Sequence, residues 1–371
     1  MKKTINSFIL LFLIRFPSLA FSQNCHTDSL NLNNVAVDFK GNYSYILPHH
    51  KYMSFLSESH FLFYEISCSK KTNGEKYWHQ LYNYPTCGAT FQYNNFGGSK
   101  ILGKAYALYP FIQLPIIKQS NFQLAFKFGS GLAFLTKKFD KDINYKNIVI
   151  STNINICINL GFEFEQRINN SFSVNEGIHL QHFSNGALKM PNPGINLPSV
   201  SMGIRFNPAK SSIEKKYNQN IPEVDKKYFL SLMTAAGLKE IYYAYNIKYP
   251  AFSLSLGFNF QPSLKRIINL NVDAFYSFAN YELVNRINNG TNMISLLRLG
   301  MSAGHEFLFG KTNFTFYMGR YLYAKENSDG NIYNRVGFKR KINKNLFINL
   351  SLKSHHFVAD YIEWGLGYNF R

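Results

Sequence analysis

Residues 182–196 read HFSNGALKMPNPGIN and lie between two segments in which apolar and polar residues alternate. The preceding segment, 171–184, is rich in Phe, Val and Ile, and the following segment, 198–206, alternates in the same way. A stretch rich in Gly, Pro and Asn between two alternating segments predicts a β-hairpin. The hairpin indicates an antiparallel β fold, with polar side chains gathered at its tip.

Alternating segments of this kind recur along the chain and predict strands, about eight between residues 35 and 206, among them 35–47 and 122–135, and about eight more between residues 229 and 370, among them 241–247. Aromatic residues make up 17% of the chain and charged residues 16%, and the mean hydropathy is −0.18. This composition is typical of strands that turn apolar side chains to lipid and polar side chains to a barrel interior. After residue 22, no stretch of the chain is apolar for 18 residues without interruption, so no transmembrane helix is expected and any membrane span has to be a β-barrel.

The first 22 residues have the features of a signal peptide. Lys2 and Lys3 precede an apolar run from Phe8 to Phe16, and Ala20 and Ser22 are small residues at the two positions that signal peptidase reads. We therefore expect export, with cleavage after Ser22.

The second half of the chain resembles the first. Residues 167–183 align without gaps to residues 341–357, with five of 17 positions identical and four conservative. The match predicts an internal duplication. The expected organisation is a signal peptide at 1–22, a first barrel repeat at 23–207, a polar linker or loop at 208–225 and a second, degenerate repeat at 226–371.

The strands allow two closures, because one large barrel and two tandem eight-stranded barrels both have an even strand count. The C-terminal residues 364–371, WGLGYNFR, resemble the aromatic-ended last strand of outer-membrane barrels. A single such strand favours one transmembrane antiparallel barrel of 14–16 strands, with two tandem barrels as the alternative.

His182 and Ser184 are two residues apart on an expected strand, so their side chains project from one face with Cα atoms about 6.5–7 Å apart. A neutral imidazole could take the proton of the serine hydroxyl as its oxygen attacks an acyl carbonyl, as in serine hydrolases. Taken alone, the pair is weak evidence and is better explained as two polar residues on one strand face.

The whole pattern, HFSNG at 182–186 followed by PNPG at 191–194, resembles the signature of the outer-membrane lipid A 3-O-deacylases, also labelled acyloxyacyl hydrolases. The resemblance covers roughly residues 33–207. It implies an eight-stranded outer-membrane barrel that removes an ester-linked acyl chain from lipid A with a His/Ser/Glu triad. Ser184 would then be the nucleophile and His182 the base. The family's acid follows the nucleophile by twelve residues, and here that residue is Asn196.

Asn196 can hold a tautomer of His182 by accepting a hydrogen bond, but it has no negative charge to stabilise an imidazolium. Activity should therefore be lower than with Glu, or be lost. Asn185, Gly186 and Asn192 are the expected oxyanion and substrate residues, since glycine allows close approach of a backbone N–H and the amide can donate. Turn formation alone would also explain these residues.

The implied reaction needs no cofactor, and the spacing of Cys25, Cys68, Cys87 and Cys157 does not indicate zinc, so no metal site is expected. The formal charge is +19. Export argues against nucleic acid as the partner of this charge, whereas the phosphates of lipid A in lipopolysaccharide fit it. The expected location is the bacterial outer membrane.

Other functions remain open at this stage. The position aligned with Ser184 in the second repeat is Val358, and this loss together with Asn196 favours a non-catalytic outer-membrane barrel, either a channel or a structural protein. An exported lipid- or glycan-binding protein is a third possibility. The residues His355, His356, Asp360 and Glu363 could form an acid/base or metal cluster, or could simply be polar residues of the last hairpin.

Overall fold

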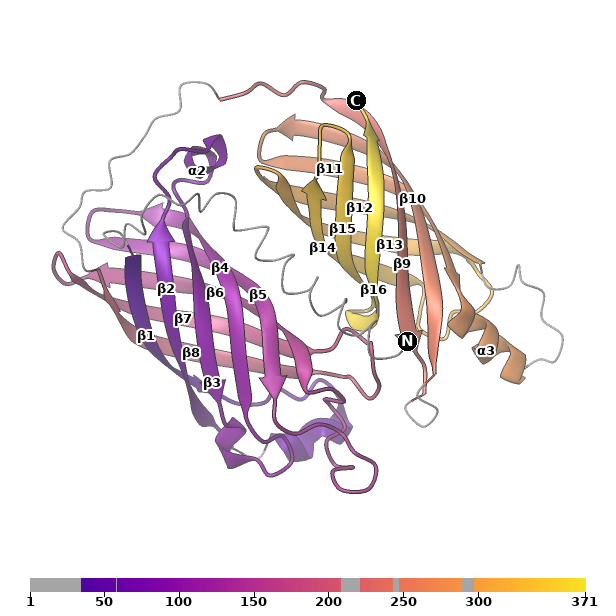
Figure 1. Cartoon of the computed structure of the whole chain (residues 1–371), viewed down its shortest axis with the longest axis horizontal. Coiled ribbons are helices and arrows are strands. Elements are labelled where there is room, and N and C mark those ends of the chain that lie inside the picture. Colours follow the sequence, from indigo (N-terminus) through magenta and orange to yellow (C-terminus); the bar gives the residue numbers. More distant parts are fainter. Residues whose placement is uncertain (1–34, 58, 208–220, 243–246, 288–296) are drawn as a thin grey trace. The chain divides into compact units, whose positions relative to one another are not determined.

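The computed structural model describes residues 35–57, 59–207, 221–242, 247–287 and 297–371, and everything below concerns these residues. They form sixteen antiparallel strands in two closed barrels, which we call barrel 1 (β1–β8) and barrel 2 (β9–β16) (Figure 1). The expected signal peptide, Cys25 and most of the expected linker lie outside the described residues.

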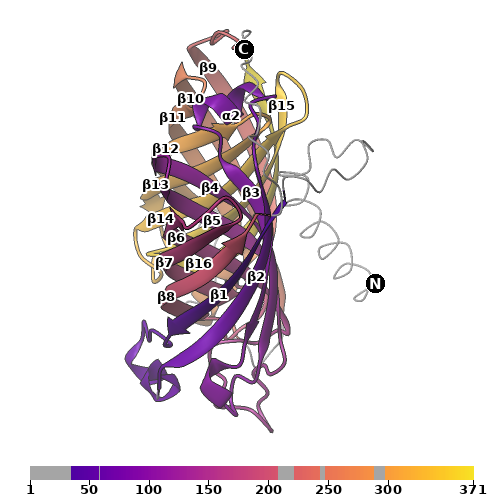
Figure 2. The ribbon, with the colours of Figure 1, turned by 90° about the vertical axis from the view of Figure 1, so that its left-hand side faces the viewer.

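In barrel 1 each strand pairs with the next, and β1 also pairs with β8, where Ser44 lies opposite Ser199 (Figure 2). Three short helical segments, η2 (Lys51–Leu56), α2 (Tyr77–Leu81) and η3 (Phe96–Gly98), lie in connections between strands. The strands are β1 (Val35–Ser44), β2 (Phe61–Lys71), β3 (Thr86–Asn94), β4 (Ala105–Lys118), β5 (Phe122–Leu135), β6 (Ile154–Arg167), β7 (Phe172–Ser184) and β8 (Ile195–Phe206).

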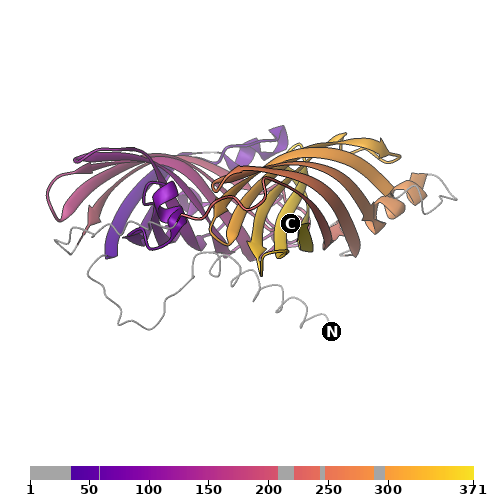
Figure 3. The same ribbon diagram turned by 90° about the horizontal axis from the view of Figure 1, so that it is seen from above.

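Barrel 2 closes in the same way, through pairing of β16 with β9, and its strands curve around the barrel interior (Figure 3). The connection after β11 contains α3 (Phe278–Ile287). The strands are β9 (Tyr228–Glu240), β10 (Lys248–Ser263), β11 (Arg266–Ser277), β12 (Leu297–Phe309), β13 (Thr312–Ala324), β14 (Ile332–Lys341), β15 (Leu346–His355) and β16 (Val358–Phe370).

Alternation along each strand separates an apolar outer surface from a polar interior. In β7, Asn175 and Gln181 are buried inside the barrel, while Ile178 and Leu180 on the other face are 60% and 45% exposed. Exposed Phe, Tyr, Leu, Ile and Val side chains recur on the outer face of the other strands. Such an apolar outer surface around a polar interior is the pattern of a barrel that spans a membrane.

Ion pairs fill the interior of barrel 1. The Glu163 carboxylate lies 2.5 Å from Lys40 Nζ and 3.1 Å from Lys127 Nζ, and Arg205 Nε lies 2.8 Å from Asp38 Oδ1. All of these side chains are buried. An eight-stranded barrel is just wide enough for side chains to fill it, so this interior is packed with paired charges rather than open to water.

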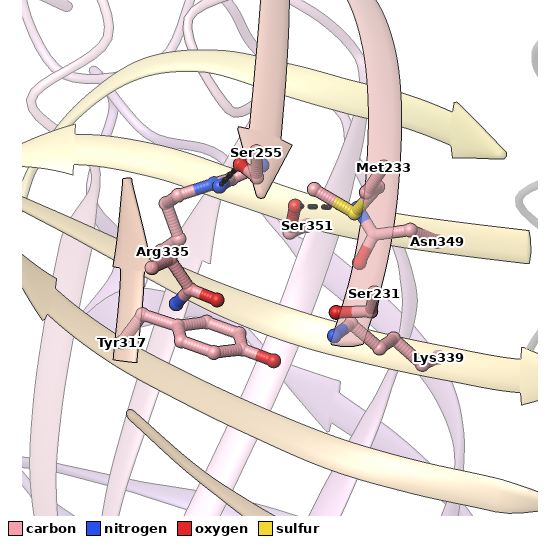
Figure 4. A pocket seen from close by; sticks show the side chains of 9 residues that line it. Ser231, Met233, Ser255, Tyr317, Arg335, Lys339, Asn349 and Ser351 are labelled. Carbon is pink, nitrogen blue, oxygen red and sulfur yellow. Dashed lines mark hydrogen bonds between the residues drawn. The ribbon is translucent and has the colours of Figure 1, made fainter. Parts of the chain in front are cut away.

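The interior of barrel 2 also contains paired charges, and Figure 4 shows Arg335 and Lys339 among the polar side chains around a small pocket there. Arg335 Nη1 lies 2.6 Å from Ser255 Oγ, and Arg335 Nε lies 2.8 Å from the carboxylate of Glu363. Elsewhere in the interior Lys339 Nζ donates to Glu306 at 2.7 Å. Each buried charge in these pairs therefore has an opposite charge or a hydrogen-bonding group beside it, as burial requires.

The prediction of an all-β antiparallel barrel is confirmed, but the preferred single barrel of 14–16 strands is wrong, and the alternative of two tandem eight-stranded barrels is correct. Alternation predicts where a strand lies but not which edge it joins. The edges of β1 and β8 satisfy each other, as do those of β9 and β16, so neither barrel leaves an open edge. The strand expected at 241–247 is also wrong in its described part, since β9 ends at Glu240 and β10 begins at Lys248.

The two ends of barrel 1 differ. The connections after β1, β3, β5 and β7 lie at one end, which we call the loop end, and each has ten or more residues. At the other end the connections after β4 and β6 are short turns at 119–121 and 168–171, and only the connection after β2, at 72–85 with α2, is long. No helix of the described residues is long and apolar enough to cross a membrane. Cys68, Cys87 and Cys157 are all free thiols.

Separate closure predicts that the barrels survive cutting of the chain between them. A protease site inserted between residues 208 and 220, cleaved in the folded full-length protein in detergent, should release two fragments that each migrate as folded barrels on unheated SDS gels. A single sixteen-stranded barrel would instead give fragments that migrate as unfolded chains before heating.

Glu163→Gln should destabilise barrel 1 by about 3–5 kcal/mol, because it removes the carboxylate charge that faces two buried lysines. The measurement is the temperature at which the folded band is lost on SDS gels. Asp142→Asn, the same chemical change at an exposed position, is the control and should leave this temperature unchanged. Equal melting of the two variants would show that the interior ion pairs contribute little.

Candidate active site

His182 lies near the end of β7 on the outer face of barrel 1, two residues beyond the exposed Leu180. The β7–β8 register places it directly opposite Asn196, and its Nδ1 lies 2.6 Å from Asn196 Oδ1. An amide oxygen only accepts hydrogen bonds, so His182 Nδ1 carries the proton. In the neutral ring, Nε2 therefore keeps a free lone pair and can act as a base.

Ser184 is the last residue of β7 and follows His182 on the same face. Its side chain is 6% exposed, and the residue lies opposite Ile156 of β6. Within the described chain no hydrogen bond joins the Ser184 hydroxyl to His182. The pair lies on one face of the strand as predicted. The missing contact does not argue against a base role for His182, because such hydrogen bonds are often long in the absence of substrate.

The connection 185–194 places the candidate oxyanion residues. Asn192 Oδ1 accepts the backbone N–H of Asn185 at 2.9 Å, and Asn185 Nδ2 donates to Ser151 Oγ at 2.9 Å. Asn192 Nδ2 is buried and has no hydrogen-bond partner among the described residues. A buried donor without a partner costs free energy of folding, so this N–H group is available to an acceptor that enters the site.

The backbone conformation of Gly186 indicates a role in forming a turn. Its φ is +64°, and the next residue, Ala187, has φ +62°. Two successive left-handed residues reverse the chain, and glycine adopts this conformation without a steric cost. The turn-forming role considered for Gly186 is therefore present, whereas Asn192 offers a side-chain donor in addition to its place in the loop.

Gly194 supports the imidazole of His182 from the other end of the same connection. It has φ +86°, and its N–H donates to the carbonyl of Val149 at 3.1 Å. A Cβ atom at this position would lie 2.6 Å from Cε1 and 3.0 Å from Nε2 of His182. The glycine therefore provides the space in which the ring lies.

His49 is a residue of the site that the sequence analysis missed. Asn196 Nδ2 lies 3.2 Å from His49 Nδ1, and the N–H of Leu47 donates to the Asn196 carbonyl at 2.9 Å. The two residues are 147 positions apart, and only pairing of β1 with β8 brings them together. The His49-His50 dipeptide directly after the first predicted strand was the one sequence signal that could have identified it.

The described residues of barrel 2 do not form an equivalent site. Its residue aligned with His182 is His356, which with Phe357 forms a two-residue turn of positive φ between β15 and β16. Val358, aligned with Ser184, begins β16. At the aligned positions the copy therefore lacks both the candidate nucleophile and the long connection that carries the candidate oxyanion donors in barrel 1.

The cluster considered at the end of the chain is an ion-pair network. His355 Nδ1 lies 3.3 Å from Asp329 and 3.6 Å from Asp360, but Asp360 also pairs with Lys353 at 2.7 Å and Lys239 at 2.5 Å. The carboxylate of Asp360, which a metal ion would need as a ligand, is thus already paired with two ammonium groups. Of the other two predicted members, His356 lies in the turn and Glu363 pairs with Arg335.

Two family models match the chain. Residues 63–205 match "Lipid A 3-O-deacylase (PagL)", and residues 228–371 match "Acyloxyacyl hydrolase, C-terminal domain". No curated protein matches the chain.

Solved structures similar to the chain include three barrels. The outer membrane enzyme PagL is 18% identical, with 45% of this chain and 97% of that chain covered and a TM-score of 0.31. Neisserial surface protein A is 9% identical, with 47% and 96% covered and a TM-score of 0.33. A Rhodopseudomonas blastica porin mutant is 8% identical, with 91% and 100% covered and a TM-score of 0.18.

Gly194→Ala should displace the ring of His182, and Gly98→Ala is its matched control. Gly98 has φ +83°, close to the +86° of Gly194, but a Cβ there would meet nothing within 4 Å. Both variants therefore bear the same backbone cost. Gly194→Ala should lower the free energy of unfolding by about 1–3 kcal/mol more, because its Cβ overpacks against the His182 ring and the Phe183 carbonyl oxygen at 2.8 Å. Thermal unfolding in detergent measures the difference, and equal losses would show that the ring does not depend on the glycine.

Proposed function

Because the chain belongs to the lipid A 3-O-deacylase family of outer-membrane barrels, we propose that barrel 1 is a serine esterase that removes an ester-linked acyl chain from lipid A. The observation that carries the proposal is the position of Ser184, His182 and Asn196 on the outer, lipid-facing surface at the loop end. Long loops of outer-membrane barrels face the cell exterior. The site would then meet the outer leaflet, where lipid A lies.

In the proposed reaction the Ser184 oxygen attacks the ester carbonyl while His182 Nε2 takes the hydroxyl proton. Asn192 Nδ2 donates to the oxyanion, together with a backbone N–H of the connection other than that of Asn185, which is bonded to Asn192 Oδ1. Collapse of the intermediate breaks the ester bond, and His182 returns the proton to the departing alkoxide of the sugar. Water, deprotonated by His182, then hydrolyses the acyl-serine and regenerates the enzyme. No step requires a cofactor.

The orientation of the Asn196 amide determines how much the missing carboxylate should slow the reaction. In a serine protease, exchange of the triad Asp for Asn lowers kcat about 10⁴-fold because the histidine adopts the wrong tautomer. Here Asn196 turns its oxygen toward His182 Nδ1, so the tautomer is the productive one. The remaining loss is the missing negative charge, and the proposed enzyme should be slower than one with Glu, yet active.

The charge of the loop end suits an anionic lipid. In the sequence of the connections at this end, eight lysines outnumber three acidic residues, Glu58, Asp140 and Asp142. Clustered lysines attract phosphate groups at a membrane surface. The lysines are Lys51, Lys100, Lys104, Lys137, Lys138, Lys141, Lys146 and Lys189.

The packed interiors argue against a channel, because buried ion pairs such as Lys40–Glu163 and Arg335–Glu363 occupy the space that a conducting pore would need. A purely structural barrel remains the alternative that the experiment below has to separate from the esterase. Barrel 2, which lacks the nucleophile, would support or assist barrel 1 without catalysing the reaction.

Mass spectrometry of lipid A from cells that express the full chain tests the proposal. Wild type should remove one acyl chain, and Ser184→Ala should leave lipid A intact because the attacking oxygen is gone. Ser199→Ala is the matched control, since Ser199 is similarly buried at 7% but lies on the inner face of β8. Intact lipid A in cells with folded wild-type protein would exclude the lipid A esterase.

Asn196→Glu should raise turnover above wild type, because a carboxylate opposite His182 stabilises the imidazolium that forms during attack. The same lipid A analysis, taken over a time course, measures the increase. A lower turnover in Asn196→Glu would show that the site depends on the amide and that a carboxylate at position 196 does not assist His182.

A further inference from the structure

We infer that His49 is a positioning residue that fixes the orientation of the Asn196 amide and, through it, the tautomer of His182. The inference rests on the proposed function only for its kinetic consequence. The geometric consequence can be measured in a protein with no activity at all.

Asn196 lies between two imidazole rings. Its Oδ1 is 2.6 Å from His182 Nδ1, and its Nδ2 is 3.2 Å from His49 Nδ1. An amide nitrogen only donates, so His49 Nδ1 has to be the acceptor and carries no proton. The three side chains therefore form a chain of hydrogen bonds in which the direction of every bond is defined.

An asparagine at this position needs such a partner, whereas a carboxylate does not. Both oxygens of a carboxylate accept, so either one sets the Nδ1–H tautomer of His182. An amide rotated by 180° would instead donate to His182 Nδ1 and force the proton onto Nε2, which removes the base. His49 can favour one orientation of the amide because its own tautomer has a second support. Proline has no N–H, so the hydrogen bond between His49 and the backbone of Pro193 is donated by the ring; with Nδ1 beside Asn196, this places the ring proton on Nε2. The rotated amide would then place an oxygen against an unprotonated nitrogen.

The fold holds His49 in place. The segment follows β1, and the bond from Leu47 N–H to the Asn196 carbonyl extends the β1–β8 pairing up to the site. The ring of His49 lies 4.8 Å from that of His50, which stacks on Tyr52.

His49 is exposed on one side, and partial desolvation on the other side, together with the neighbouring His50, lowers its pKa, while a hydrogen bond to the backbone of Pro193 opposes this shift. The titratable rings that face His49 are His50 and His182. A lowered pKa keeps His49 neutral and its Nδ1 able to accept at neutral pH. The acceptor is lost only as the pH falls through that lowered pKa, when Nδ1 gains a proton.

The kinetic test uses the full-length protein in detergent and a chromogenic fatty-acyl ester. His49→Ala should lower kcat about 3- to 10-fold, the effect of one lost hydrogen bond, with KM unchanged because His49 does not touch the substrate. His49→Gln, whose side-chain oxygen can accept from Asn196 Nδ2, should recover most of the rate. His60→Ala removes an exposed histidine of the same connection and should match wild type.

The second comparison repeats His49→Ala in an Asn196→Glu background. A carboxylate needs no orienting partner, so the His49 substitution should change kcat less than twofold there. An equal loss in both backgrounds would show that His49 acts by some other route and would overturn the inference.

The measurement that does not depend on activity is ¹⁵N NMR of the histidine rings in detergent micelles. In wild type, His182 should carry its proton on Nδ1, and His49→Ala should give a mixture of the two tautomers. An unchanged His182 tautomer in His49→Ala would overturn the positioning role. If the tautomer shifts but wild type shows no Ser184-dependent hydrolysis, the positioning role is supported and the proposed function fails.

Discussion

Closure of each sheet on itself is the constraint on which the rest of this structure depends. In a membrane every backbone N–H and C=O has to pair within the protein, and a ring of eight strands achieves this when β1 meets β8 and β9 meets β16. Closure assigns each strand one inner and one outer face. Charged residues such as Glu163 then lie inside among partners, and apolar residues such as Ile178 face outward.

The candidate site is a local exception on the outer face, and closure also explains how it is supported. His182 and Asn196 are polar residues among apolar neighbours, and they satisfy each other across the β7–β8 pair. The β1–β8 pair adds His49 from the other end of the repeat. Barrel 2 uses the same closure with a two-residue turn in place of the long connection, so the same fold is present without the site.

The sequence was sufficient for features that depend on local pattern and insufficient for those that depend on long-range pairing. Alternation predicted the strand 122–135 at its observed bounds, and spacing placed His182 and Ser184 on one face. Alternation could not show which edges close the barrels, because every strand offers the same backbone groups. That is also why His49 was missed: under the preferred single barrel, β1 would have paired with a different strand and not with β8.

The central claim is that Ser184 is a nucleophile activated by His182, and covalent labelling tests it most directly. A long-chain fluorophosphonate, which reacts with activated serines, would be added to the full-length protein in outer membranes, and peptides analysed by mass spectrometry. The account predicts an adduct on Ser184 in wild type that is absent from Ser184→Ala and from His182→Ala. An unlabelled Ser184 in folded wild-type protein, or labelling that persists in His182→Ala, would contradict it.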